Sequence, residues 1–326
     1  EAIEPWLREL EQRPLRSAAE LERWLMDRSE LDSWIGEEAT RRNIAAARQT
    51  DDTAAEAAHL EFQTEIVPLI KPVDDQLDRK YLACPCRQQL DRGFWKVHDR
   101  EVELAVQIFR PENVELEARE EEMVVEYGKI TGAMTVSWRG RTWTLAELAR
   151  FAEEPDRGVR EEAWRLAADR RGRDAAALEC LFDRMHAVRA QIAAQAGFRN
   201  FRDYMHAASG RFDYSSADCL ALGENVARYV VPVVRRMNAW RQERLGVETL
   251  RPWDLAADPL AAPPFAPFHG QDEHVAISAR LLARVHPDFA EELRWMQEAG
   301  LLDLESRPHK RSGGFMDTFE GTRVPF

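Results

Sequence analysis

Cysteine is scarce in this sequence. Only Cys84, Cys86, Cys180 and Cys219 occur among 326 residues, too few for a disulfide framework in a chain of this length. No run of about 18 apolar residues is present, and the first thirty residues are charged and amphipathic, so the sequence offers neither a membrane span nor a secretory signal. These absences predict a cytoplasmic protein with reduced thiols.

Positive charge is also in deficit. The chain has 45 Lys and Arg against 58 Asp and Glu, a net charge of −13. A charge of this sign repels phosphate backbones and anionic lipid surfaces, so we expect no nucleic-acid partner and no membrane partner. The 10 Trp and 14 Phe supply ample material for a hydrophobic core and argue against a disordered chain.

Familiar catalytic and cofactor motifs are missing as well. The sequence has no Gly-x-Ser-x-Gly elbow, no Gly-x-Gly-x-x-Gly turn and no phosphate-binding loop. No histidine is followed by glutamate, so the His-Glu-x-x-His zinc helix is absent. Cys84 and Cys86 are too close together to grip one zinc ion, and we expect a turn with two buried or reduced thiols. We expect His186, beside an apolar stripe, to be a hydrogen-bonded residue of a helix interface.

Helical periodicity dominates what is present. Ser17 and Glu20 form a capping box before one apolar face, and helices are also expected near 52–81, 174–196 and 215–245. Prolines at 68, 72 and 232 are expected to kink or divide two of them. Only residues 123–144 alternate in the manner of β structure. The sequence therefore predicts a mainly α fold with one small antiparallel β hairpin or meander near 123–144.

Several strings in the second half match a known family in order. They are Ala196 to Met205, Gly210 to Tyr214, Leu250 to Leu255, Leu302 to Arg307, and Gly313-Gly314-Phe315. With these strings the chain resembles the oligoendopeptidase F branch of the thimet-type zinc oligopeptidases. The first half agrees with that family only in character, as helices plus one hairpin.

The resemblance implies a multi-helix, bowl-like metalloendopeptidase that traps short peptides in a channel between two lobes. We expect residues 1–150 to form an N-terminal helical lobe with the small β meander, and residues 151–326 to form the first part of the helical catalytic domain. In the family, one zinc ion is held by two His of a His-Glu-x-x-His helix and by a later Glu, and it activates a water molecule for peptide hydrolysis.

The sequence departs from the family at this decisive place. The zinc helix is expected a few tens of residues after the Gly-Gly-aromatic string, yet the chain stops at Phe326, so no catalytic residue and no metal ligand can be assigned here. We expect an N-terminal portion of a zinc peptidase, inactive alone, with the missing C-terminal half of the same protein as a partner. The alternative is a catalytically silent helical binding or scaffold protein that retains the fold without the metal half.

One functional string can be carried over by position. Gly313, Gly314 and Phe315 correspond to a substrate-binding segment, and paired glycines let another backbone approach closely. We expect an edge strand here that hydrogen-bonds an extended peptide. A plain glycine turn is the alternative that the sequence leaves open.

Overall fold

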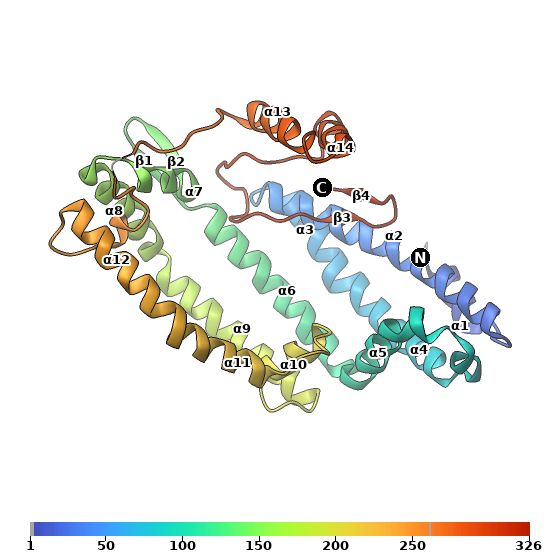
Figure 1. Cartoon of the computed structure of the whole chain (residues 1–326). Coiled ribbons are helices and arrows are strands. Elements are labelled where there is room, and N and C mark those ends of the chain that lie inside the picture. The colour runs from blue at the N-terminus through green and yellow to red at the C-terminus, as the bar shows by residue number, and fades with distance from the viewer. Residues whose placement is uncertain (1–2, 261) are drawn as a thin grey trace.

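The chain is built almost entirely from helices, and the mainly α fold class is confirmed. The computed structural model describes residues 3–260 and 262–326, and Figure 1 shows long helices lying side by side with two small hairpins. The helices of the first half are α1 (Glu4–Gln12), α2 (Ala18–Arg48), α3 (Thr53–Glu61), α4 (Val67–Ala83), α5 (Arg92–Ile108) and α6 (Pro111–Gly132). No helix among the described residues is both long and apolar enough to cross a bilayer.

The second half continues with shorter helices. They are α7 (Leu145–Leu148), α8 (Arg157–Arg173), α9 (Ala175–Gln195), α10 (Phe201–Ala208), α11 (Ser216–Asn225), α12 (Val231–Leu245), α13 (Gln271–Leu282) and α14 (Pro287–Glu298). Three 3-10 turns cover Pro85–Gln89, Ala149–Glu153 and Pro252–Asp254. The strands pair in two antiparallel hairpins, β1 (Thr135–Trp138) with β2 (Arg141–Thr144) and β3 (Thr318–Phe319) with β4 (Val324–Pro325).

The core of the first half forms where α1, α2, α4 and α5 meet. Trp24, Leu77 and Tyr81 are fully buried there. The indole Nε1 of Trp24 donates to the carbonyl of Leu10 at 2.9 Å, and Nζ of Lys80 donates to that same carbonyl at 2.6 Å. Carbonyls in the last turn of a helix have no partner within the helix, so these two side chains both cap α1 and hold it on the core.

The two neighbouring cysteines belong to this core. Cys84 and Cys86 are buried free thiols on either side of the start of a 3-10 turn. Burial raises the pKa of the Cys86 thiol, and the adjacent Cys84 raises it further. A thiol with a raised pKa stays protonated and is a poor metal ligand. The prediction of a turn with two buried thiols is confirmed.

The predicted β segment begins later than the sequence suggested. Residues Met123 to Gly132 are the last part of α6, and only residues 135–144 form a hairpin. Leu116 and Met123 of α6 are buried against α9. Residues seven positions apart lie on the same face of a helix, so these two residues form one buried helical face. Packing against α9 outweighs the β preference of Val124 and Val125.

The prolines were expected to kink or divide the helices, and the structure shows that they do not divide them. Residues 53–83 stay helical because a π turn, Phe62–Ile66, precedes Pro68, and the N–H of Val67 donates to the carbonyl of Phe62. A second π turn, Val226–Val230, precedes Pro232 and joins α11 to α12. Because proline has no N–H for the carbonyl four residues earlier, a wider turn at that point lets the helix continue.

Two further clusters form the core of the second half. Leu181, Val188 and Ile192 of α9 pack on α6, and the tryptophans of the first hairpin pack on α7 and α8. His186 lies off the buried stripe of α9, exposed, with its ring stacked on Phe182 at 6.3 Å between centroids. The interpretation of His186 as a helix-interface residue is therefore wrong, since one position along a helix rotates a side chain about 100° away from the stripe.

A buried ion-pair network joins α8 to the turn after α12. Asp254 is fully buried and accepts hydrogen bonds from Arg157 Nε at 2.9 Å and Arg160 Nη2 at 3.2 Å. Arg160 is also buried and donates to the carbonyl of Trp253 at 3.0 Å. A charge removed from water needs partners of this kind, so the network fixes the turn to α8.

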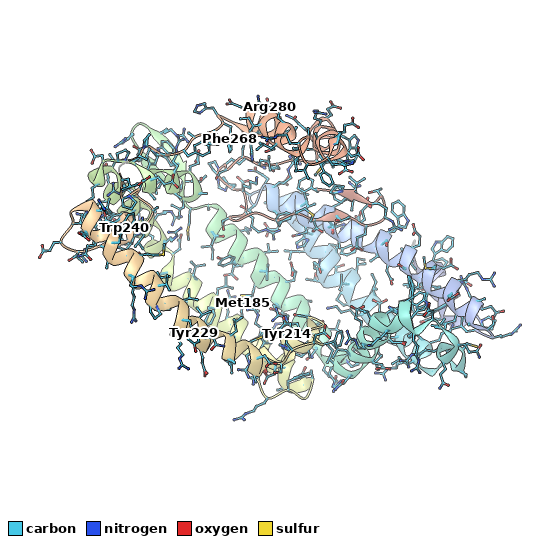
Figure 2. The ribbon with its side chains drawn as sticks, viewed as in Figure 1. Met185, Tyr214, Tyr229, Trp240, Phe268 and Arg280 are labelled. Atoms are coloured by element: carbon cyan, nitrogen blue, oxygen red, sulfur yellow. The ribbon has the colours of Figure 1, made fainter. Side chains whose placement is uncertain are left out.

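The helix formed by α11, the second π turn and α12 lacks a packing partner over most of its length. It runs along the outer side of the molecule (Figure 1), and Figure 2 labels Tyr229 and Trp240 on it. None of its residues is buried. Its exposed large apolar side chains are Leu220, Leu222, Val226, Tyr229, Val230, Val233, Val234, Met237 and Trp240. Exposed apolar patches of this extent are characteristic of interaction surfaces.

We expect this exposed helix to make the chain associate and bind a hydrophobic dye. Replacing Val234 with Glu and Met237 with Lys, both exposed, removes apolar surface without touching the core, so dye fluorescence and the associated fraction in light scattering should both fall. A parent chain that is strictly monomeric, binds no dye and melts cooperatively would contradict this expectation.

Candidate functional site

The predicted substrate-binding residues lie in an irregular segment near the end of the chain. Gly313, Gly314 and Phe315 are exposed and belong to no strand. The edge strand expected here is therefore wrong as a regular element, since backbone pairing begins only at Asp317 and the strand β3 has two residues, Thr318 and Phe319. Gly313 has a φ of +95°, a conformation that side chains with a Cβ rarely adopt, which explains glycine at that position.

A charged turn shapes the chain just before this segment. Asp303 accepts from Arg307 at 2.7 and 2.8 Å, from Lys310 at 2.9 Å and from Arg48 of α2 at 3.0 Å. Hydrogen bonds from Arg307 hold the pKa of Asp303 well below its usual range. Burial alone would raise this pKa, but Lys310 lowers it further. The carboxylate thus stays charged and fixes residues 303–310 against α2.

Arg311 anchors the segment on its N-terminal side. Its backbone N–H donates to the carbonyl of Ala47 at 2.9 Å, and its guanidinium donates to Oδ1 of Asn43 at 3.0 Å. The guanidinium also lies 5.6 Å from the ring centroid of Phe315, within cation–π range. Arg311 therefore fixes both the start of the segment and its aromatic side chain, Phe315.

The second hairpin anchors the segment on its C-terminal side. Asp317 and Phe326 exchange backbone hydrogen bonds at 3.0 and 2.8 Å. The buried carboxylate of Glu37 on α2 accepts from the N–H and the hydroxyl of Thr322 at 2.6 and 2.9 Å. A Cβ at Gly321 would lie 2.7 Å from the ring of Trp34, so glycine is required where the hairpin rests on α2.

Between these two anchors the backbone is free. Within the part of the chain that the structure describes, no hydrogen bond involves the backbone of Ser312–Met316. A Cβ built on Gly314 would meet nothing within 4 Å, so the space beside it is open. A fixed segment with unpaired N–H and C=O groups and no obstructing side chain can pair with an extended peptide.

Sequence reasoning missed the buried pair beneath Arg311. His59 is 2% exposed, and its Nε2 lies 3.1 Å from Oε1 of Glu121. Its Nδ1 has no hydrogen-bond partner among the described residues, and His59 and Arg311 both line a cavity of about 20 Å³, room for one water molecule. The pair joins α3 to α6 across 62 positions, and no local pattern signals such a contact.

The described residues do not fit a zinc ion. Within residues 3–260 and 262–326, no three His, Cys, Asp or Glu side chains are grouped so that they could hold a metal. His274 stacks flat on Phe268 with 4.2 Å between ring centroids; Figure 2 labels Phe268 beside α13. Among the described residues, the candidate site is therefore the segment Ser312–Met316 with its free backbone groups.

A family model matches part of the chain. The sequence model of Peptidase family M3 matches residues 150–325. No curated protein matches the chain.

Solved structures match nearly the whole chain. PZ peptidase A with inhibitor 2 is 25% identical with a TM-score of 0.91, covering 99% of this chain and 57% of its own. An oligoendopeptidase F is 24% identical with a TM-score of 0.93, and the match covers 100% of this chain and 57% of that protein. An oligoendopeptidase F from Bacillus anthracis str. Ames is 21% identical with a TM-score of 0.91, and the match covers 99% of this chain and 60% of that protein. The chain thus spans less than two thirds of the length of the structures it matches.

Proposed function

The chain belongs to peptidase family M3, and on that premise we propose that it forms part of a zinc metalloendopeptidase that hydrolyses short peptides inside a channel. When bound, the zinc supplies an activated water for attack on the peptide carbonyl. We propose that the zinc ligands and the general base are contributed by residues outside this chain, so that the 326 residues alone do not cleave peptides.

The role assigned to this chain is to hold the substrate. We propose that Ser312–Met316 binds an extended peptide through its free backbone groups and that Phe315, set by Arg311, borders the bound peptide. The observation that supports this role is the unpaired backbone between two firm anchors on α2. Main-chain pairing would give affinity for peptides of many sequences and fix their direction.

The domain division is proposed on the same basis. Residues 1–150 form an N-terminal helical lobe and residues 151–326 the first part of the catalytic domain, with the peptide segment lying where the second part returns to α2 of the first (Figure 1). The four unpaired cysteines support a cytoplasmic location for the protein.

Replacing Gly314 with Val tests the binding role. A Cβ there meets no atom within 4 Å and φ is not in the left-handed region, so the fold should tolerate the change while the added side chain occupies the space of the peptide backbone. We expect at least about tenfold weaker binding of a fluorescent octapeptide, measured by anisotropy, which corresponds to about 1.4 kcal/mol.

The matched control is Gly172→Val in α8, where a Cβ also meets nothing within 4 Å. Its peptide affinity should equal that of the parent chain. Equal affinities for the parent and the Gly314→Val chain would refute the role of the segment.

Reading the gene beyond the codon for Phe326 tests the proposal that the protein is a zinc peptidase. A His-Glu-x-x-His run there supports the peptidase, and a stop codon supports a silent binding protein.

A further inference from the structure

A cavity of about 140 Å³ lies directly beside the free backbone segment. One wall comes from the end of α6 and the first hairpin with α7, including Met134, Thr144 and Ala146. The opposite wall comes from the charged turn and the segment itself, including Leu304, Ser306 and Gly313. The cavity therefore lies between two parts of the chain about 160 residues apart, one of which is the proposed peptide-binding segment.

Most polar side chains around this cavity are already paired. The hydroxyls of Thr144 and Ser306 hydrogen-bond each other at 2.8 Å, and Thr144 also caps α7 through the N–H of Glu147. Arg307 and Lys310, which line the cavity, direct their charges to Asp303. The free backbone groups of Ser312 and Gly313 are the ones proposed to pair with the peptide backbone, so a side chain of the peptide is left mainly the apolar surface of Met134, Leu145, Ala146 and Leu304.

The size of the cavity limits that occupant to a few carbon atoms. A cavity of about 150 Å³ accommodates benzene in another protein, so this volume suits a branched aliphatic side chain such as that of leucine. Met134 is buried and Leu304 is half-exposed, and these two residues provide apolar contact on opposite sides.

The position of the cavity connects it to a bound peptide. Successive side chains of an extended strand point to opposite faces, so a peptide paired with Ser312–Met316 sends every second side chain toward one side of that segment. Ser312 and Gly313 form part of the cavity wall, and Gly313 has no side chain to separate the cavity from a neighbouring strand.

We propose that this cavity is a subsite that receives one aliphatic side chain of the bound peptide and thereby sets a sequence preference. The inference rests on the proposed peptide-binding function of Ser312–Met316. Backbone pairing supplies affinity that is indifferent to sequence, and the subsite adds a preference at a single position of the peptide.

A set of octapeptides in which each position in turn is Leu or Ala tests the subsite, with affinities for the chain measured by anisotropy. The parent chain should prefer Leu over Ala by about tenfold at one position. Ala146→Leu fills the cavity from its exposed rim and should abolish this preference. Ala149→Leu, exposed and outside the lining, is the matched control and should keep the preference.

A second variant guards against a merely structural effect. Leu304→Ala enlarges the cavity and should move the preference at the same position from Leu toward Phe, a gain that a misfolded chain cannot show. A parent chain that binds peptides with no position favouring Leu, or a preference that survives Ala146→Leu, would overturn the subsite and leave the backbone proposal standing. Absence of any peptide binding by the parent would overturn both.

Discussion

Replacing Asp254 with Ala is expected to lower the free energy of unfolding by about 3–5 kcal/mol. The substitution leaves Arg160, only 3% exposed, without its carboxylate partner at 3.2 Å. Arg160 keeps its hydrogen bonds to the carbonyls of Glu154 and Trp253, but none of these neutralises its charge. An unpaired buried charge is costly, and urea unfolding followed by circular dichroism measures the loss.

The same carboxylate gives this stability a defined pH dependence. Burial alone would raise the pKa of Asp254, but hydrogen bonds from Arg157, from the backbone N–H of Arg251 and from Arg160 outweigh it and lower the pKa to about 2. Because the folded pKa lies below the unfolded value of about 3.9, the stabilisation is fully present above about pH 4 and is lost as the pH falls toward 2. The difference between parent and variant should therefore shrink over that range.

Asp213 provides the control for this substitution. Its side chain is 88% exposed and lies 3.6 Å from Arg100, and exposed ion pairs of this kind contribute about 0–1 kcal/mol. Asp213→Ala should therefore unfold close to the parent chain at every pH. Equal losses from the two variants would show that the Asp254 network does not stabilise the fold.

Replacing Trp24 with Ala is expected to lower the free energy of unfolding by about 3–5 kcal/mol. The indole is completely buried and donates to the carbonyl of Leu10, so the variant loses packing and a helix cap together. Hydrogen exchange followed by mass spectrometry locates the effect. Increased exchange confined to residues 1–150 would also support the proposed division into two parts.

Trp6 is the matched control, because it is a tryptophan of the same lobe with 66% of its surface exposed. Trp6→Ala should lower the free energy of unfolding by less than about 1 kcal/mol. A similar loss for both substitutions would contradict the assignment of Trp24 to the core.

Local signals in the sequence predicted the helices well. The side chain of Ser17 accepts from the N–H of Glu20 at 3.2 Å, and Gly246 ends α12 in the left-handed conformation with φ of +64°. Capping and periodicity act over four or five residues, and the sequence displays them directly. The end of α6 was misplaced because packing on α9, about 60 residues later, decides between helix and strand there.

The candidate site was predictable only in part. The paired glycines at 313 and 314 pointed to the segment whose backbone is free in the structure, but its two anchors join it to α2 from the far end of the sequence. Arg48 and Asp303 are 255 positions apart, and Glu37 and Thr322 are 285 apart. No pattern in a single sequence pairs such residues, so the free backbone between them could be recognised only in the folded structure.

The attachment of residues 303–326 to α2 also fixes the order of events during synthesis. At about 5–20 residues per second, the 255 positions between Arg48 and Asp303 take about 13–50 s to translate. The N-terminal helices can pack on the ribosome during that interval, whereas the segment that would bind peptides cannot dock until nearly all 326 residues have emerged. The nascent chain can therefore pack its N-terminal helices before the segment with the free backbone docks on α2.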